Sequence, residues 1–176
     1  KELQITKVPK RGRSLFPKLK ESKQKLLQVY SLTAQTIKDK QVVSPAAEWF
    51  VDNYYIIEDQ LREIEQDLPR NYYYELPKLE TGELKGYPRV YAMTMAIIAH
   101  TDSRLDGDNL RRFIQSFQKV APLSIRELWA VPITLRIALL DRLTPLALRI
   151  VNGRKNRQKA DVFADQLLAL AALPQA

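Results

Sequence analysis

Residues 48–79 read EWFVDNYYIIEDQLREIEQDLPRNYYYELPKL, and the apolar spacing in the first half of this stretch decides the fold class. The apolar residues recur at steps of four and three, which places them on one stripe of an α-helix. They are Phe50, Tyr54, Ile57, Leu61, Ile64 and Leu68. Ser44 and Pro45 supply a cap and a first-turn proline. Pro69 ends the helix, because proline lacks an amide hydrogen.

The acidic side chains of this stretch lie on the opposite, solvated face of the same helix. Glu58 and Arg62 are four residues apart there, a spacing that suits an ion pair. Residues 69–79 follow as a structured turn in which the tyrosines, Arg70 and Lys78 hold neighbouring helices or another domain. We favour internal packing over docking for this turn, because irregular polar segments are commonly fixed by internal hydrogen bonds.

The rest of the chain has the same periodicity and only five glycines, which predicts an all-α protein. We expect a single multi-helix domain of about six to seven helices. Further helices are expected at residues 19–42, with the stripe Leu26, Leu27, Tyr30, Thr33 and Ile37; at residues 88–100, with Val90, Met93 and Ile97 buried; and after Asp106 as cap, with Leu110, Phe113, Ile114 and Phe117 as apolar positions.

Ser124 and Glu127 give the clearest local signal, a capping box that begins a helix. This helix contains Trp129, which we expect in the core, and Pro132, which we expect to kink it. The polar and basic residues 152–155 should stop it, and a last helix should cover residues 159–173.

Charge is concentrated at the start of the chain. Residues 1–25 hold nine Lys and Arg against two acidic residues, and so carry +7 of the net charge of +8. We interpret them as a solvated, mobile basic leader ahead of a helical domain over residues 26–176. The alternative is an interaction module that binds an anionic membrane surface or nucleic acid through this leader. Nucleic acid is the less expected of the two, because one aromatic residue, Phe16, is interleaved with these cations.

The residue types of this sequence give little support to a catalytic function. The sequence contains no cysteine, which excludes disulfides, thiolate nucleophiles and cysteine-bound zinc. His100 would have to be the base in any histidine-dependent scheme, and its place at a helix end favours a structural role. Asp106 and Asp108 match a short metal-binding pattern, but helix capping explains Asp106 better. We expect no catalytic residue, metal or cofactor in this chain.

The longest uncharged run, residues 90–101, is too short to span a bilayer, and no signal peptide is visible. The sequence begins with Lys rather than Met. We therefore expect an excised piece of a longer protein.

Four long strings resemble the helical region that precedes the membrane segments in bacterial cyclic β-1,2-glucan synthases. They are EWFVDNYYIIEDQLREI, DLPRNYYYELPKL, GYPRVYAMTMAIIAHTDSRLDGDNLRRFIQSFQ and PLSIRELWAVPITLRIALLDRL, which together cover about residues 44–147. The resemblance implies a very large inner-membrane enzyme. Its glycosyltransferase domain polymerises glucose from UDP-glucose with a divalent metal, and a distant phosphorylase-like domain of glycoside hydrolase family 94 adjusts chain length.

The resemblance implies an accessory role for this piece, on the cytoplasmic side of the inner membrane, with the membrane and catalytic domains of its own chain as partners. No catalytic residue is carried over. The candidates for interaction are Arg70, Tyr72, Tyr73, Lys78 and Arg89. The residues expected to maintain the structure are Trp49, Asp52, Arg62, His100, Asp106, Ser124, Glu127 and Trp129.

Overall fold

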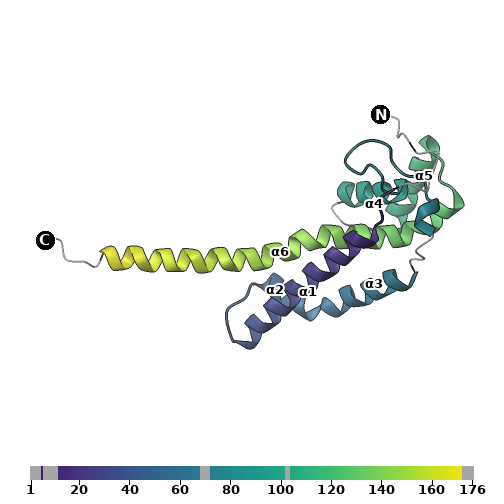
Figure 1. The fold of residues 1–176 in the computed structure, drawn as a ribbon. Helices are drawn as coiled ribbons and strands as arrows, with labels where there is room; N and C mark the ends of the chain where they lie inside the picture. Colours follow the sequence, from purple (N-terminus) through teal and green to yellow (C-terminus); the bar gives the residue numbers. More distant parts are fainter. Residues whose placement is uncertain (1–4, 6–11, 68–71, 102–103, 172–176) are drawn as a thin grey trace. The chain divides into compact units, whose positions relative to one another are not determined.

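A computed structural model describes residues 5, 12–67, 72–101 and 104–171, without the side chains of residues 72, 73 and 169–171. In these residues all regular structure is helical, which confirms the all-α class (Figure 1). The elements are α1 (Phe16–Lys38), α2 (Pro45–Asp52), α3 (Tyr54–Asp67), the 3₁₀ helix η1 (Tyr72–Glu75), α4 (Arg89–His100), α5 (Gly107–Val120) and α6 (Ile125–Ala171). Within the described ranges, none of these helices has the length and apolarity needed to cross a bilayer.

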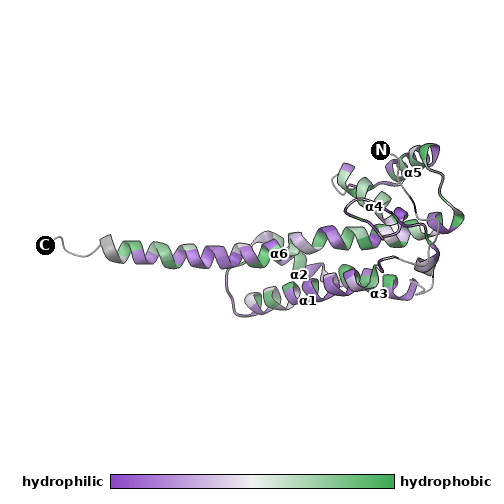
Figure 2. Cartoon of the chain, turned by 45° about the horizontal axis from the view of Figure 1, so that its top comes forward, coloured by the Kyte–Doolittle hydropathy of each residue, from purple (hydrophilic) through white to green (hydrophobic). Residues whose placement is uncertain are grey.

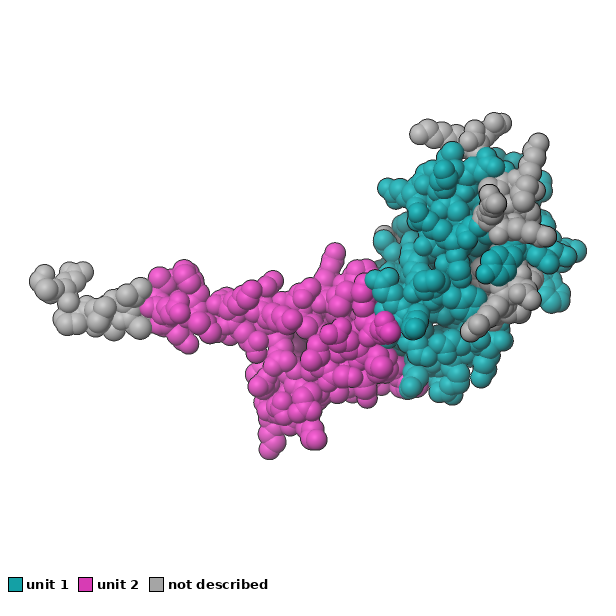
Figure 3. All heavy atoms as spheres, in the orientation of Figure 1, with its two compact units in different colours: residues 1–23, 56–143 teal, residues 24–55, 144–176 magenta. Residues whose placement is uncertain are grey.

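The chain forms two compact units (Figure 3). Unit 1 comprises residues 1–23 and 56–143, and unit 2 comprises residues 24–55 and 144–176. The boundaries between the units fall inside α1, α3 and α6, so each of these helices contributes residues to both.

The core of unit 1 is built on α4. This helix buries Val90, Met93 and Ile97, as its periodicity predicts, together with Tyr91 and Ile98. The other buried apolar side chains of unit 1 come from the start of α1 and the residue before it, from α3, from the loop before α4, and from the first part of α6 and the loop before it. They are Leu15, Leu19, Ile57, Leu61, Ile64, Leu76, Leu79, Leu123, Ala130, Val131, Ile137, Ala138 and Leu140.

The loop before α4 is fixed by backbone hydrogen bonds and by the segment that precedes α1. Leu79 N donates to Tyr87 O at 3.0 Å, and Gly86 N donates to Leu79 O at 2.7 Å. Gly86 has a φ of 84°, a left-handed conformation that favours glycine. Its carbonyl accepts a hydrogen bond from Arg13 N at 2.7 Å. The chain is therefore held in place three residues before α1 begins.

Unit 2 has an aromatic core around Tyr54. The Tyr54 ring stacks on Tyr30 with a centroid separation of 4.2 Å and meets the edge of Phe50 at 5.8 Å. Leu26, Val29, Ala47 and Ala147 complete the buried apolar residues of this unit. The predicted stripe from Phe50 to Ile64 is thus buried throughout, whereas Leu68 and Pro69 lie outside the described residues.

The register of α1 differs from the sequence prediction. Its buried positions follow steps of four and three through Leu15, Leu19, Ser22, Leu26, Val29, Thr33 and Thr36. Leu27 and Ile37, both assigned to the apolar stripe, are exposed instead. Leu26 and Thr33 of the predicted stripe are buried, but the prediction was wrong at Leu27 and Ile37, because the hydroxyl residues Ser22 and Thr36 are buried in place of these two apolar residues. The apolar positions predicted for α5 do not enter the core either, since none of the residues of this helix is fully buried.

Two predicted helix boundaries are also corrected. Residues 45–67 are divided into α2 and α3 at Asn53, whose side-chain amide donates to Trp49 O at 2.8 Å and caps α2. In contrast, α6 runs without interruption through residues 152–155 to Ala171. Gly153 does not adopt the left-handed conformation with which glycine ends helices. Apolar and polar residues continue to mix along this part of α6 (Figure 2).

Candidate functional site

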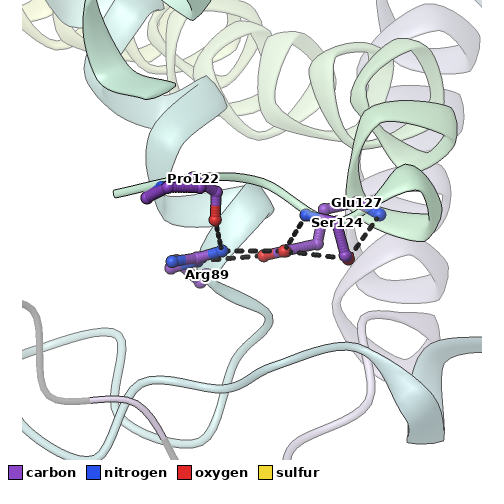
Figure 4. A network of polar contacts seen from close by, with 4 residues as sticks. All are labelled: Arg89, Pro122, Ser124 and Glu127. Carbon is purple, nitrogen blue, oxygen red and sulfur yellow. Dashed lines mark hydrogen bonds and ion pairs between the residues drawn. The ribbon is translucent and has the colours of Figure 1, made fainter. Parts of the chain in front are cut away.

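Arg89 and Glu127 form a buried ion pair at the centre of a polar network in unit 1 (Figure 4). Arg89 begins α4 and Glu127 lies in the first turn of α6. Arg89 Nε donates to Glu127 Oε1 at 2.9 Å, and Arg89 Nη2 donates to Glu127 Oε2 at 2.7 Å. The two residues are 5% and 1% exposed. This two-point geometry is the strong form of an arginine–carboxylate pair.

The remaining hydrogen-bonding capacity of the pair is used by the chain itself. Arg89 Nη2 also donates to Pro122 O at 3.0 Å. Ser124 donates to Glu127 Oε2 from its backbone N at 2.9 Å and from its hydroxyl at 3.0 Å. Glu127 N donates to Ser124 Oγ at 3.3 Å, which confirms the predicted capping box. Arg89 is therefore a structural residue, and its assignment as an interaction candidate was wrong.

A second polar network, which is partly buried, joins α1, α4 and α6. Lys18 Nζ lies 2.8 Å from Asp141 Oδ2 and donates to Tyr91 Oη at 3.0 Å. The Tyr91 hydroxyl donates to the same carboxylate oxygen, and Ser22 Oγ donates to Asp141 Oδ1 at 3.2 Å. No local pattern in the sequence indicates this network, because Ser22 and Asp141 lie 119 residues apart and Lys18 lies still farther from Asp141 along the chain.

The pKa values of Lys18 and Tyr91 are both shifted in this network. Burial raises the pKa of Tyr91, and its hydrogen bond to Asp141 raises it further. Burial alone would lower the pKa of Lys18, but its hydrogen bonds to Asp141 and Tyr91 raise it above the ordinary value. A phenol that stays neutral and an ammonium that stays charged do not exchange protons near pH 7. The network therefore suits structural support rather than general acid–base catalysis.

Lys78 is buried, so its assignment as an interaction candidate was wrong. Its Nζ donates to the carbonyl oxygens of Tyr74 and Leu76, each at 3.2 Å. Burial lowers the pKa of Lys78. Gly12 lies directly against its side chain, since a Cβ atom at Gly12 would stand 1.9 Å from Lys78 Cδ. Lys78 therefore fixes the turn from inside and is not available to a partner.

The other interaction candidates are placed only in part. Arg70 lies outside the described residues. Tyr72 and Tyr73 belong to η1, and their side chains are outside the description. Glu75, in the same 3₁₀ helix, forms an exposed ion pair with Arg126. The role of Arg70, Tyr72 and Tyr73 in docking therefore stays a prediction.

Among the residues expected to maintain the structure, Asp106 caps α5 as predicted, with Asn109 N donating to its Oδ1 at 2.7 Å. Asp52 and His100 are the last residues of α2 and α4. Arg62 pairs with Asp59 at 3.4 Å rather than with Glu58.

The acidic face of α3 is more engaged than predicted. Lys23 of α1 lies 2.7 Å from Glu65, and Arg136 of α6 lies 3.2 Å from Glu63 and 3.8 Å from Asp67. These cations come from distant parts of the sequence. The face that sequence analysis assigned to solvent therefore also connects α3 to two other helices of unit 1.

The two tryptophans are on the surface. Trp129 is 78% exposed and Trp49 is 63% exposed, so the prediction that Trp129 is in the core was wrong. The reason is the rotation of α6, which buries Glu127, Ala130 and Thr134 and directs Trp129 away from them. Ile125, one turn before Trp129, is also exposed. We call Ile125 and Trp129 the Trp129 surface.

Within the described ranges, no three His, Asp or Glu side chains lie close enough together to hold a metal ion. In the two networks described above, Arg89 binds Glu127 and the carbonyl of Pro122, and Lys18 binds Asp141.

Comparison with known proteins gives one informative relationship. No family model matches the chain. The chain is 35% identical over 151 residues to the cyclic beta-(1,2)-glucan synthase NdvB of Rhizobium meliloti strain 1021. The match covers 86% of this chain and 5% of that protein. The chain thus corresponds to a small segment of a far longer polypeptide.

Proposed function

Because this chain is related over most of its length to a segment of a cyclic β-(1,2)-glucan synthase, we propose that it is a non-catalytic helical accessory region of such an enzyme. In this proposal it acts as a scaffold for the rest of its own polypeptide. The sequence relationship is the observation that carries the proposal. The full-length protein polymerises glucose from UDP-glucose in the bacterial inner membrane, and this region lies on the cytoplasmic side.

The polar networks support a scaffold rather than a catalyst. Arg89, Glu127, Lys18 and Asp141 satisfy one another inside unit 1. A substrate-binding group would instead present unsatisfied donors or acceptors to a cleft. In the proposal, UDP-glucose and the divalent metal are therefore bound by other parts of the polypeptide.

The Trp129 surface supplies a contact for those other parts. Exposed tryptophan is enriched at the centres of protein interfaces, because the ring buries a large area with few rotatable bonds. Since the matching segment is 5% of the related enzyme, we assign the occupant to another segment of the same polypeptide. The membrane and catalytic domains are the proposed partners.

Deletion of residues 44–147 from the full-length protein tests this proposal. We expect less synthase in the membrane and less glucan, because the remaining domains lose their scaffold. The amount of membrane-bound synthase, the glucan output and the ring size should be measured together. If all three stay normal, the scaffold role is wrong.

The basic charge of residues 1–25 supports a second function, binding of an anionic membrane surface. Of the nine cations, Lys18 and Lys23 form ion pairs inside unit 1, and Arg13 lies 5.8 Å from the ring centroid of Tyr87. Four of the other six cations, Lys1, Lys7, Lys10 and Arg11, precede residue 12 and would supply most of the membrane binding. Truncation of residues 1–11 should strongly weaken binding to vesicles of anionic lipid if this function is correct, and unchanged binding would contradict it.

A further inference from the structure

Unit 2 contains a cleft of about 610 Å³ that none of the functions above uses. One wall is the end of α1 with the turn that follows it, and the other is the stretch of α6 from Arg149 to Asp161. This volume lies within the range of small-molecule sites. The cleft is formed by residues of unit 2 alone.

The lining is strongly basic. Lys40, Arg149, Arg154, Lys155 and Arg157 contribute five positive charges, and Asp161 contributes one negative charge. No salt bridge between described residues involves any of these six side chains. Cations gathered in a concave site repel one another and attract a counter-charge. The charge of this cleft is thus left for a ligand to balance.

Arg154 is oriented before any ligand arrives. Its Nη1 donates to Thr36 Oγ1 in the last turn of α1, and its Nη2 donates to Gln41 Oε1 in the turn that follows this helix. A guanidinium carries five N–H donors, so these two bonds leave further donors on the same rigid group. A pre-oriented guanidinium loses less conformational entropy when it binds an oxyanion than a free one does.

Lys40 occupies a position that favours glycine. Lys40 N donates to Ile37 O at 3.0 Å and Gln41 N donates to Thr36 O at 3.1 Å, the hydrogen-bond pattern that ends many helices. Lys40 has a φ of 55° in this turn, where a side chain is unfavourable. A lysine in a left-handed conformation at the mouth of a cleft points to a role for its ammonium group.

Apolar side chains line the cleft beside these cations. They are Leu32, Val42, Val43, Ala47, Ile150 and Val151. The ligand should therefore combine anionic groups with a less polar part. Arginine groups match phosphate oxygens in two-point geometry, and lysine supplies further point charges.

We propose that this cleft binds a ligand that carries phosphate groups, either as a soluble phosphate ester or as the headgroup of a phospholipid. Arg154 and Arg157 are one turn apart on α6 and contact the phosphate oxygens. Lys40 approaches the same groups from the end of α1. The test of this site does not depend on the proposed scaffold function, because ligand binding is measured without glucan synthesis.

Calorimetric titration of the 176-residue chain with inorganic pyrophosphate tests the proposal. Arg157→Gln should weaken binding about tenfold, the effect of losing one hydrogen bond to a charged group. The matched control is Lys159→Gln, which removes the same charge two residues away on α6 from a side chain outside the lining. It should change binding less than about twofold, because solvent screens that charge. Asp161→Asn should strengthen binding by removing the one repulsive carboxylate.

Vesicles of phosphatidylglycerol, with phosphatidylcholine vesicles as control, distinguish the two sources of phosphate. Binding of pyrophosphate that Arg157→Gln weakens supports a soluble ligand. Binding confined to phosphatidylglycerol vesicles and weakened by the same variant supports a lipid headgroup. Absence of binding to both probes, or equal losses in Arg157→Gln and Lys159→Gln, would overturn the proposal. Circular dichroism of each variant should confirm an unchanged helix content.

Discussion

Arg89 and Glu127, which are 38 residues apart in the sequence, form a two-point ion pair inside unit 1 that connects the first residue of α4 to the first turn of α6. Glu127 also closes the capping box with Ser124. The Glu127 carboxylate thus caps the N-terminus of α6 and also holds α4 against this helix. A residue with both tasks cannot be replaced without effects on unit 1.

Arg89→Met should lower the free energy of unfolding by about 3–5 kcal/mol, because it leaves the Glu127 carboxylate buried without its main partner. Arg89→Met combined with Glu127→Leu should lose less than the sum of the single changes, since no unpaired charge remains. Urea denaturation followed by circular dichroism measures both. The control is Arg62→Gln, whose exposed pair with Asp59 should contribute less than about 1 kcal/mol. Equal effects of Arg89→Met and Arg62→Gln would contradict the structural role.

Gly12→Ala should destabilise unit 1. The new Cβ atom would meet Lys78 Cδ at 1.9 Å and Gly86 O at 2.7 Å, so the lysine and the turn must move. Gly153→Ala is the control, because nothing lies within 4 Å of a Cβ atom there and the residue is inside α6. That change should stabilise the chain by about 0.5–1 kcal/mol. Thermal melting of the two variants should shift in opposite directions, and a shift in the same direction would argue against the close approach of Gly12.

The Lys18–Tyr91–Asp141 network predicts a loss of stability in alkali. The folded-state pKa values of Lys18 and Tyr91 are raised above their ordinary values of 10.5 and 10.0. Their contribution is therefore complete below about pH 10 and is lost as pH rises further, because the unfolded chain releases these protons first. Burial lowers the pKa of Lys78, so the ionisation of this residue has the opposite effect: it makes the folded chain more stable as the pH rises.

Tyr91→Phe should reduce the alkaline decline of the melting temperature above pH 10. Tyr55→Phe is the matched control, because the Tyr55 side chain is exposed. The Tyr55→Phe variant should show the same decline of the melting temperature with pH as the unchanged protein. If both variants show the same slope, Tyr91 does not contribute to the pH dependence as we infer.

Lys40→Gly should raise the free energy of unfolding by about 1 kcal/mol, because glycine adopts the left-handed conformation without strain. Lys38→Gly, two residues earlier and still inside α1, should lower it by about 1 kcal/mol. The same substitution thus has opposite signs at two neighbouring lysines. Denaturant titration that finds both variants less stable would contradict the strained conformation of Lys40.

Trp129→Ala should change the free energy of unfolding of the chain by less than about 1 kcal/mol, because the side chain is exposed. Phe50→Ala provides the contrast, since burial of that ring predicts a loss of about 3–5 kcal/mol. If Trp129 contacts another segment of the synthase, its removal should instead reduce assembly of the full-length protein. A large loss of stability in the isolated chain would contradict the position of the indole on the surface.

Local patterns in the sequence predicted the local structure well. The stripe from Phe50 to Ile64, the cap at Asp106 and the capping box at Ser124 depend on residues a few positions apart, and all are confirmed. The break at Asn53 was missed because the apolar stripe continues across it. The prediction that a helix ends at residues 152–155 was wrong, because composition alone does not show whether a glycine takes a left-handed conformation.

Contacts between distant residues could not be predicted in this way. Nothing near Arg89 in the sequence indicates Glu127, and nothing near Lys18 indicates Asp141. Arg89 and Lys78 were predicted to be on the surface, because charged residues are rarely buried without partners. Neither partner is visible in the local sequence: Arg89 pairs with the distant Glu127, and Lys78 binds backbone carbonyls. The exposure of Trp129 likewise depends on the rotation of α6, whose buried face includes Thr134 as well as apolar residues such as Ile137 and Leu140.

Glucan formed per molecule of membrane-bound synthase tests the central claim most directly, when the full-length protein carries Arg89→Met, with or without Glu127→Leu. A non-catalytic scaffold predicts that Arg89→Met lowers the amount of synthase in the membrane while the rate per remaining molecule stays normal. It also predicts that the double variant recovers part of that amount. A normal amount of synthase with a greatly reduced rate per molecule would place Arg89 in the catalytic machinery and contradict the account.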